Sequence, residues 1–232
     1  MRLCILSALA QPAPQAGFSF SYKGRFDNNS GLSSYTFAAV DIGDPPPPGL
    51  NRLVCVGVTA AAATNLSISS VNANAGAVVG VVGASGGGLT RISEFWTLNI
   101  PTGSTADIVV TASGNLARCA IHVWVIYTSQ SGHAAASAMA IQNGGNSLTT
   151  NPVAIPVSGV AMAIVHIINA SGGPVAWTAS AGTPTKRNDA LIGSTIWASA
   201  ADLDGQGGAS ATFTADGADG VNYRGASIAY GP

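Results

Sequence analysis

Apolar and polar residues alternate with a period of two along most of the chain. Alternate residues of a strand point to opposite faces of a sheet, so this pattern predicts β-strands with one buried face. Ten short segments show it: Leu32–Ile42, Arg52–Thr59, Leu66–Val71, Arg91–Ile100, Asp107–Thr111, Arg118–Thr128, Val160–Ile168, Leu191–Ala198, Ala209–Ala215 and Tyr223–Tyr230. The nearest approach to a helical pattern is His133–Gln142, which is rich in alanine. A short helix and an extended loop are equally compatible with that segment.

Glycine- and proline-rich turns separate the predicted strands. The longest is Asp44–Gly49, which contains four consecutive prolines, and Gly86–Gly88 and Gly172–Pro174 are shorter examples. Many short strands with regular turn signals are typical of an antiparallel β-sandwich or a jelly roll. We therefore expect an all-β chain with one antiparallel, jelly-roll-like sandwich domain over residues 18–232.

The first residues form a separate segment, 1–17. A basic residue followed by a short apolar stretch resembles a secretory signal peptide, but the stretch is short for one. Pro12 and Pro14 favour extended backbone, so we expect an extended N-terminal arm. Its apolar side chains would bury against a neighbouring subunit. These are Leu3, Ile5, Leu6 and Leu9.

Two internal patterns bear on how the strands pack. Ala120–Tyr127 and Ala161–Ile168 are apolar on both faces, which is typical of a strand between two layers or at a subunit interface. The dipeptides Ile100-Pro101 and Ile155-Pro156 are followed by similar strand-and-turn sequences. The repetition indicates one hairpin motif used twice, but it is too weak to establish a duplicated domain.

Low charge limits the classes of partner. Charged residues make up 8% of the chain and the net charge is −1, whereas the apolar fraction of 47% is that of an ordinary globular protein. This composition argues against disorder, and nine scattered basic residues against a nucleic-acid binder. The longest apolar runs are too short to span a bilayer as a helix. A net charge near zero favours association, so we expect a homo-oligomer, with a trimer weakly favoured.

The cysteines and histidines offer few chemical options. Cys55 and Cys119 lie in strand-like segments, where a disulfide bridge and two buried free thiols are the alternatives. His122 and His166 would face each other if their strands paired, and two histidines can begin a metal site. The other interpretation, which we favour, is a pair of hydrogen-bonded interior histidines.

The carboxylates give no convincing catalytic pattern. Glu94 is the only glutamate, and no spacing singles out the aspartate with which a glycosidase would pair it. Asp202 and Asp204 resemble half of a calcium loop, but an EF-hand would need a closing glutamate where Phe213 stands. No nucleophile elbow or phosphate-binding loop occurs in the sequence. We therefore expect no enzymatic activity, no cofactor and no resident metal, with calcium at Asp202 and Asp204 left open.

The aromatic residues divide into two groups. The four tryptophans lie in strand-like segments and are expected mostly in the core. Four tyrosines are the better candidates for an exposed, ligand-binding or inter-subunit surface: Tyr22, Tyr35, Tyr223 and Tyr230.

Two stretches resemble a family of known proteins. The segments Leu32–Val58 and Ile100–Trp124 are similar to β-rich structural virion proteins of tailed bacteriophages and prophages of alphaproteobacteria. The resemblance implies a non-enzymatic component of the particle exterior: capsid decoration, neck or tail accessory. It also implies other virion proteins as partners and assembly in the host cytoplasm.

Two alternatives remain beside this hypothesis. One is a receptor- or glycan-binding domain of a tail fibre or adhesin, with a host surface glycan as ligand. The other is a secreted polysaccharide-degrading enzyme, which would need two carboxylates facing each other in a groove.

Overall fold

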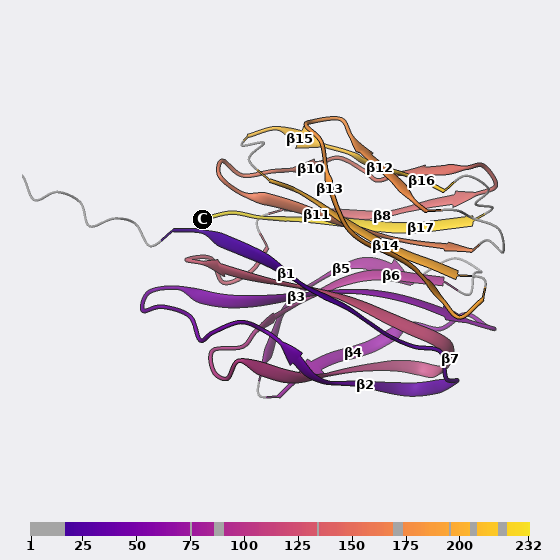
Figure 1. Ribbon diagram of the computed structural model, residues 1–232, viewed down its shortest axis with the longest axis horizontal. Coiled ribbons are helices and arrows are strands. Elements are labelled where there is room, and N and C mark those ends of the chain that lie inside the picture. The colour runs from indigo at the N-terminus through magenta and orange to yellow at the C-terminus, as the bar shows by residue number, and fades with distance from the viewer. Residues whose placement is uncertain are drawn as a thin grey trace, which may run out of the picture.

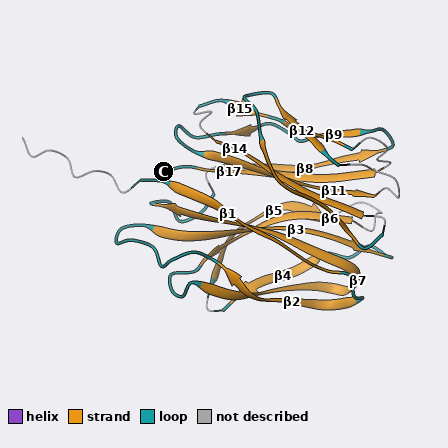
Figure 2. Cartoon of the chain, in the orientation of Figure 1, coloured by secondary structure: helices purple, strands orange, loops and turns teal. Residues whose placement is uncertain are grey.

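The computed structural model describes residues 17–74, 76–85, 91–133, 135–168, 174–194, 196–204, 208–217 and 222–232. Within these ranges the regular structure is entirely β, in antiparallel pairs (Figure 2). The expected all-β sandwich is thereby confirmed. The arm residues Leu3, Ile5, Leu6 and Leu9 lie outside the described residues.

The first half of the chain forms one sandwich. Its inner sheet has the order β1-β7-β3-β6-β5, and its outer layer consists of β2 and β4, which both pair with the N-terminal part of β7. The 24-residue strand β7 belongs to both layers, and register shifts near Leu116 mark where it passes between them. The strands are β1 (Ser19–Asn28), β2 (Leu32–Asp41), β3 (Asn51–Ala62), β4 (Ile68–Ala73), β5 (Ala77–Ser85), β6 (Arg91–Asn99) and β7 (Thr105–Thr128).

The second half forms another sandwich. Its inner sheet has the order β13-β14-β11-β17-β8, and its outer layer contains the sheet β12-β16-β9 and the small pair β10-β15. The strands are β8 (Ala135–Asn143), β9 (Ser147–Thr149), β10 (Val153–Ala154), β11 (Val160–Ile168), β12 (Ala176–Ala179), β13 (Thr185–Ile192), β14 (Ile196–Asp204), β15 (Ser210–Ala211), β16 (Phe213–Asp216) and β17 (Asn222–Tyr230).

The two sandwiches have the same topology. If β9 and β10 together are the counterpart of β2, and β15, β16 and β17 together the counterpart of β7, every strand pairing of the first half recurs in the second in the same chain order. The two halves also share one backbone hydrogen bond just beyond the ends of these strands. Ile42 N, after β2, donates to Ser104 O at 2.9 Å, and Ile155 N, after β10, donates to Ala209 O at 2.9 Å. The chain is therefore a tandem duplication of one β-sandwich topology.

The duplicated sandwiches stack through their inner sheets, so the strands lie in four layers (Figure 1). Among the described residues, one apolar core fills the first sandwich, two smaller ones fill the second, and two lie between the inner sheets, a larger central one and a small one around Ala61 and Ala198. This central core includes Cys55, Phe95 and Trp124 from one side and Met162 and Ile164 from the other. Residues 119–126 of β7 and most of strand β11 are covered on both faces, as their two-sided apolar pattern predicts.

A glycine permits close contact at this interface. A Cβ atom on Gly57 would lie 2.8 Å from Cγ2 of Ile164 and 3.0 Å from Cε1 of Phe95. Real Cβ atoms do not approach other atoms so closely, so the two inner sheets pack against the bare backbone of β3 at this point.

Several sequence predictions need correction. Residues 135–143 form strand β8 rather than a helix or loop, because β17 offers an open edge with which they pair. Leu191–Ala198 is not one strand: it contains the turn between β13 and β14. Asp107–Thr111 and Arg118–Thr128 are parts of the single strand β7. Finally, Ile100-Pro101 precedes β7 and Ile155-Pro156 precedes β11, which are not counterparts in the duplication.

Candidate assembly site

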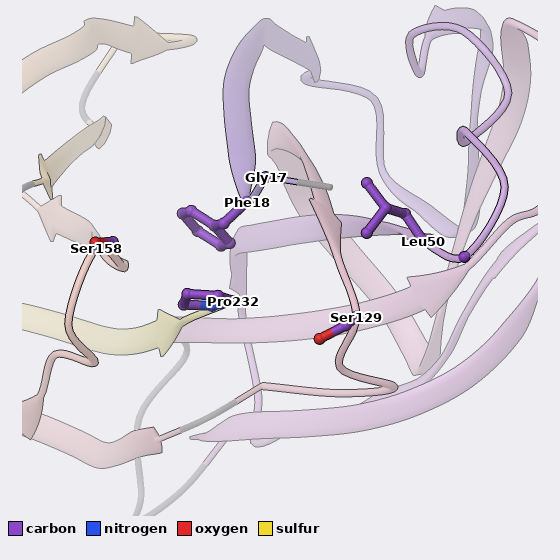
Figure 3. A pocket seen from close by; sticks show the side chains of 7 residues that line it. Gly17, Phe18, Leu50, Ser129, Ser158 and Pro232 are labelled. Atoms are coloured by element: carbon purple, nitrogen blue, oxygen red, sulfur yellow. The ribbon is translucent and has the colours of Figure 1, made fainter. Parts of the chain in front are cut away.

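A hollow lies at the seam between the two sandwiches, at the end of the molecule where both chain ends lie (Figure 3). Its volume is about 400 Å³. Each half contributes the loop before its central strand and a residue that follows its last strand. The lining residues are Gly17, Phe18, Gly49, Leu50, Ser129, Ser158 and Pro232.

Two further hollows adjoin this one. Both include Leu50, and together they follow the proline loop, residues 45–48, on either side. Gly17, the first described residue, lines two of the three hollows. The surface around Leu50 is therefore a concave, largely apolar region with Gly17 in its lining.

Arg52 joins the segment just before the proline loop to the loop between β6 and β7. The guanidinium is fully buried, and it donates from Nε to Ile100 O at 2.8 Å and from Nη2 to Thr102 O at 2.6 Å. Its Nη1 donates to Gly43 O and Gly103 O, both at 2.7 Å. The carbonyl groups of two loops thus satisfy one buried cation. Nothing in the sequence pattern distinguishes Arg52 from a surface arginine, so sequence reasoning missed it.

The opposite wall is held by hydrogen bonds to the chain end. Thr128 Oγ1 donates to Gly231 O at 2.6 Å, and Gln130 Nε2 donates to Pro232 O at 3.0 Å. Tyr127 Oη donates to Asp44 O at 2.7 Å and so joins β7 to the start of the proline loop. Both walls of the hollow therefore rest on the inner sheet of the first sandwich.

Three of the four candidate surface tyrosines are interior residues, which corrects that prediction. Tyr35 is 1% exposed, and Tyr223 and Tyr230 are fully buried. Each hydroxyl has an interior partner, which explains how a polar tip is tolerated there. Tyr35 donates to Leu116 O at 2.9 Å, Tyr223 donates to Gly217 O at 2.8 Å, and Tyr230 bonds the Thr97 hydroxyl at 2.7 Å.

Tyr22 is half-buried beside His122. Its hydroxyl lies 3.1 Å from His122 Nδ1, and its ring packs against Trp124 with centroids 5.1 Å apart. Burial raises the pKa of Tyr22 well above its usual range. Burial also lowers the pKa of His122 to about 3, with the charge of Arg25 as a second cause. Both groups are therefore neutral in the folded protein at neutral pH.

The two candidate histidines do not face each other as a pair on adjacent strands. His122 lies on β7 in the first sandwich and His166 on β11 in the second. Burial lowers the pKa of His166 to about 3. Among the described residues, no group of three or more histidines, cysteines and acidic residues is placed to hold a metal ion.

Cys55 and Cys119 are both buried free thiols, so they do not form the bridge that the sequence left open. Cys55 faces the core between the sandwiches and Cys119 the core of the first sandwich. Their side chains therefore point to opposite faces of one sheet. Burial raises the pKa of Cys55 to about 12, which keeps the thiol protonated.

Of the acidic candidates, Asp202 and Glu94 are engaged in the interior, whereas Asp204 is exposed. Asp202 is buried, and its Oδ2 accepts hydrogen bonds from Arg187 Nε at 2.7 Å and Trp124 Nε1 at 2.9 Å. Asp204 is exposed at the end of β14, and residues 205–207 of the calcium-like loop lie outside the described residues. Glu94 is buried and accepts a hydrogen bond from Trp96 Nε1 at 3.1 Å.

The described residues include no helix that is long and apolar enough to cross a membrane. No family model, curated protein or solved structure matches the chain.

Proposed function

We propose that this chain is a non-enzymatic structural protein of a phage particle exterior that assembles with copies of itself through its N-terminal arm. The resemblance of residues 32–58 and 100–124 to β-rich virion proteins is one support. The observation that carries the proposal is the hollow around Leu50, because the arm leaves the body of the molecule at its rim.

The chemistry of arm and hollow is complementary. The arm carries Leu3, Ile5, Leu6 and Leu9, and the hollow presents Phe18, Leu50 and Pro232 as apolar lining. At ~25 cal/mol per Å² of buried apolar surface, four such side chains contribute several kcal/mol. Ordering the backbone costs ~1–2 kcal/mol per residue, which over the whole arm exceeds this gain. The arm therefore binds stably only when several subunits come together.

The charge distribution supports association as well. Of the described basic residues, three are buried and three are half-buried, and only Lys186 and Arg187 are exposed. The exposed charges are otherwise aspartates, which are Asp27, Asp41, Asp44, Asp107, Asp204 and Asp216. A surface with so few charges gives weak mutual repulsion between copies.

The glycan-binding alternative has less support. It depended on exposed aromatic residues, and Tyr35, Tyr223 and Tyr230 are interior. Only Tyr22 of that set reaches the surface, and its hydroxyl already bonds His122.

The test compares the full chain with a variant lacking residues 2–16, using sedimentation velocity over a range of concentrations. We expect the full chain to form a defined oligomer and the truncated chain to stay folded but monomeric. Leu50→Asp should disrupt the oligomer in the same way, whereas Ile141→Asp on the exposed edge strand β8 serves as the control and should not. Equal assembly of all four proteins would refute the arm mechanism.

A further inference from the structure

Basic side chains line up at the end of the interface opposite the hollow. In the inner sheet of the first sandwich, Ala61 of β3 is the register partner of Arg91 on β6 and of Arg118 on β7. Register partners in a sheet point to the same face. Phe95 and Trp124 lie an even number of residues from these arginines and belong to the core between the sandwiches. Arg91, Ala61 and Arg118 therefore form one row directed at the second sandwich.

A second row faces it. In the inner sheet of the second sandwich, His166 of β11 is the register partner of Ala198 on β14 and of Arg224 on β17. Ser93, two residues from Arg91 on the same face of β6, donates from Oγ to Arg224 O at 3.0 Å. This bond places the arginine ends of the two rows next to each other.

These groups are buried, and several of their donors have no acceptor. Arg91 is 8% exposed, and His166 and Arg224 are fully buried. Within the described chain, Arg91 Nε and Nη1, Arg224 Nε and both ring nitrogens of His166 lack a hydrogen-bond partner. The ring of His166 lies beside the backbone of Ala60 and Ile92. Its two nitrogens are not placed to form good hydrogen bonds with them.

No carboxylate among the described residues balances this charge. The ion pairs of the described chain involve Lys23, Arg25, Lys186 and Arg187, and none involves the arginines of the two rows. Arg118 Nη1 donates only to the carbonyl of Ile192, at 2.7 Å. Arg224 donates to Tyr223 O at 2.6 Å and more weakly to the Asn143 amide oxygen at 3.4 Å.

The charges are close enough to affect one another. Burial and the charge of Arg91 lower the pKa of Arg224, and Arg91 and Arg118 both contribute to the lowered pKa of His166. A buried charge is costly unless it is paired, and an unsatisfied donor adds to that cost. Among the described residues, this group of like charges with free donors therefore has no anion to balance it.

We propose that the two rows bind a small tetrahedral oxyanion, phosphate or sulfate, between the sandwiches, with Arg91, Arg224 and His166 as its principal ligands. The planar guanidinium group donates two parallel hydrogen bonds to such an oxyanion, which a chloride ion cannot accept in that way. Because the ligands come from β6, β11 and β17, the anion joins the two halves of the chain. This site is independent of the assembly function proposed above.

The experiment measures thermal unfolding of the full chain in an amine buffer with chloride as the counter-ion. Millimolar sodium phosphate or sulfate should raise the unfolding midpoint saturably by about 5 °C, and sodium chloride of equal ionic strength should not. Arg91→Met should abolish the shift. Lys23→Met removes an equal charge elsewhere and should keep it.

Calorimetric titration of phosphate into the folded chain provides a second measurement. Arg91→Lys retains the charge but not the planar fork, and should weaken binding by roughly tenfold or more. This variant decides the matter if Arg91→Met does not fold. A midpoint shift that is equal in the original chain and in the Arg91 variants, or the absence of saturable phosphate binding, would overturn the proposal.

Discussion

Arg52 and Arg91 show two ways in which this protein contains a buried cation. Both lie near the first residue of an inner strand of the first sandwich, and because β3 and β6 are antiparallel they lie at opposite ends of the sheet. Arg52 is surrounded by four carbonyl oxygens at 2.6–2.8 Å, which satisfy all three of its nitrogens. Arg91 leaves Nε and Nη1 without an acceptor among the described residues.

The difference separates a structural arginine from one that can bind a ligand. The loops around Arg52 are shaped by its hydrogen bonds, so its removal leaves carbonyl groups buried without donors. The neighbours of Arg91 are an alanine, a histidine and further arginines, which gain nothing from its charge. Burial alone therefore does not define the role of a charged residue. Its role depends on which hydrogen-bond and ion-pair partners surround it.

The largest expected effect is that of Arg52→Met. This change removes the donors of four loop carbonyls and should lower the free energy of unfolding by about 3–5 kcal/mol. Urea denaturation, monitored by tryptophan fluorescence, measures this free energy. Lys23→Met is the control: Lys23 forms a partly exposed ion pair with Asp41 at 3.1 Å, which is worth at most about 1 kcal/mol. Equal effects of the two changes would contradict the structural role of Arg52.

Gly57 lies on β3 between the Arg52 end and the Arg91 end of the sheet. A substitution at Gly57 tests whether both ends depend on close packing of the two inner sheets. Gly57→Ala would place a methyl group 2.8 Å from Ile164 Cγ2, so we expect a loss of about 1–3 kcal/mol from overpacking. Denaturation should still be a single transition, because the two inner sheets share one core. A loss of cooperativity would mean that the sandwiches unfold separately, against the prediction of one domain over residues 18–232.

Acid should weaken the histidine-containing part of the interface. Burial lowers the pKa of His122 and of His166 to about 3, below the unfolded value of about 6.5. The unfolded state therefore binds more protons between about pH 6.5 and about pH 3, and stability falls as pH decreases through this range. Each histidine contributes a slope of about 1.4 kcal/mol per pH unit.

Denaturation midpoints across this pH range in amine buffers with chloride measure the slope. Tyr22 and Arg25 face His122, whereas Arg91, Arg118 and Arg224 surround His166. His122→Gln should reduce the slope by about half. An unchanged slope in this variant would show that other groups govern the acid response.

Arg91→Met should have the smallest effect on stability. In buffer without oxyanions the change removes an unbalanced buried charge, so the free energy of unfolding should rise or change by less than about 1 kcal/mol. This result would contrast with that of Arg52→Met under the same conditions. A loss as large as that of Arg52→Met would mean that Arg91 is also a structural arginine.

The sequence by itself determined the class of fold and most of its central strands. Period-two alternation in Arg52–Thr59, Val160–Ile168 and Tyr223–Tyr230 gave the core strands β3, β11 and β17, because a half-buried strand requires that pattern. The two-sided apolar runs predicted strands covered on both faces. The sequence pattern did not predict edge strands such as β8, because their composition is also compatible with a helix or loop.

Only the tertiary structure decided how the strands combine and which polar residues matter. The duplication exists in the order of hydrogen-bonded strands, and the paired Ile-Pro motifs do not correspond to it. Tyr35, Tyr223 and Tyr230 can be interior residues because carbonyl or hydroxyl groups from other parts of the chain form hydrogen bonds with their hydroxyls. The Arg52 cage, the hollow around Leu50 and the facing rows of Arg91 and Arg224 join segments far apart in sequence. Such sites are set by strand register between distant segments, which local residue patterns do not encode.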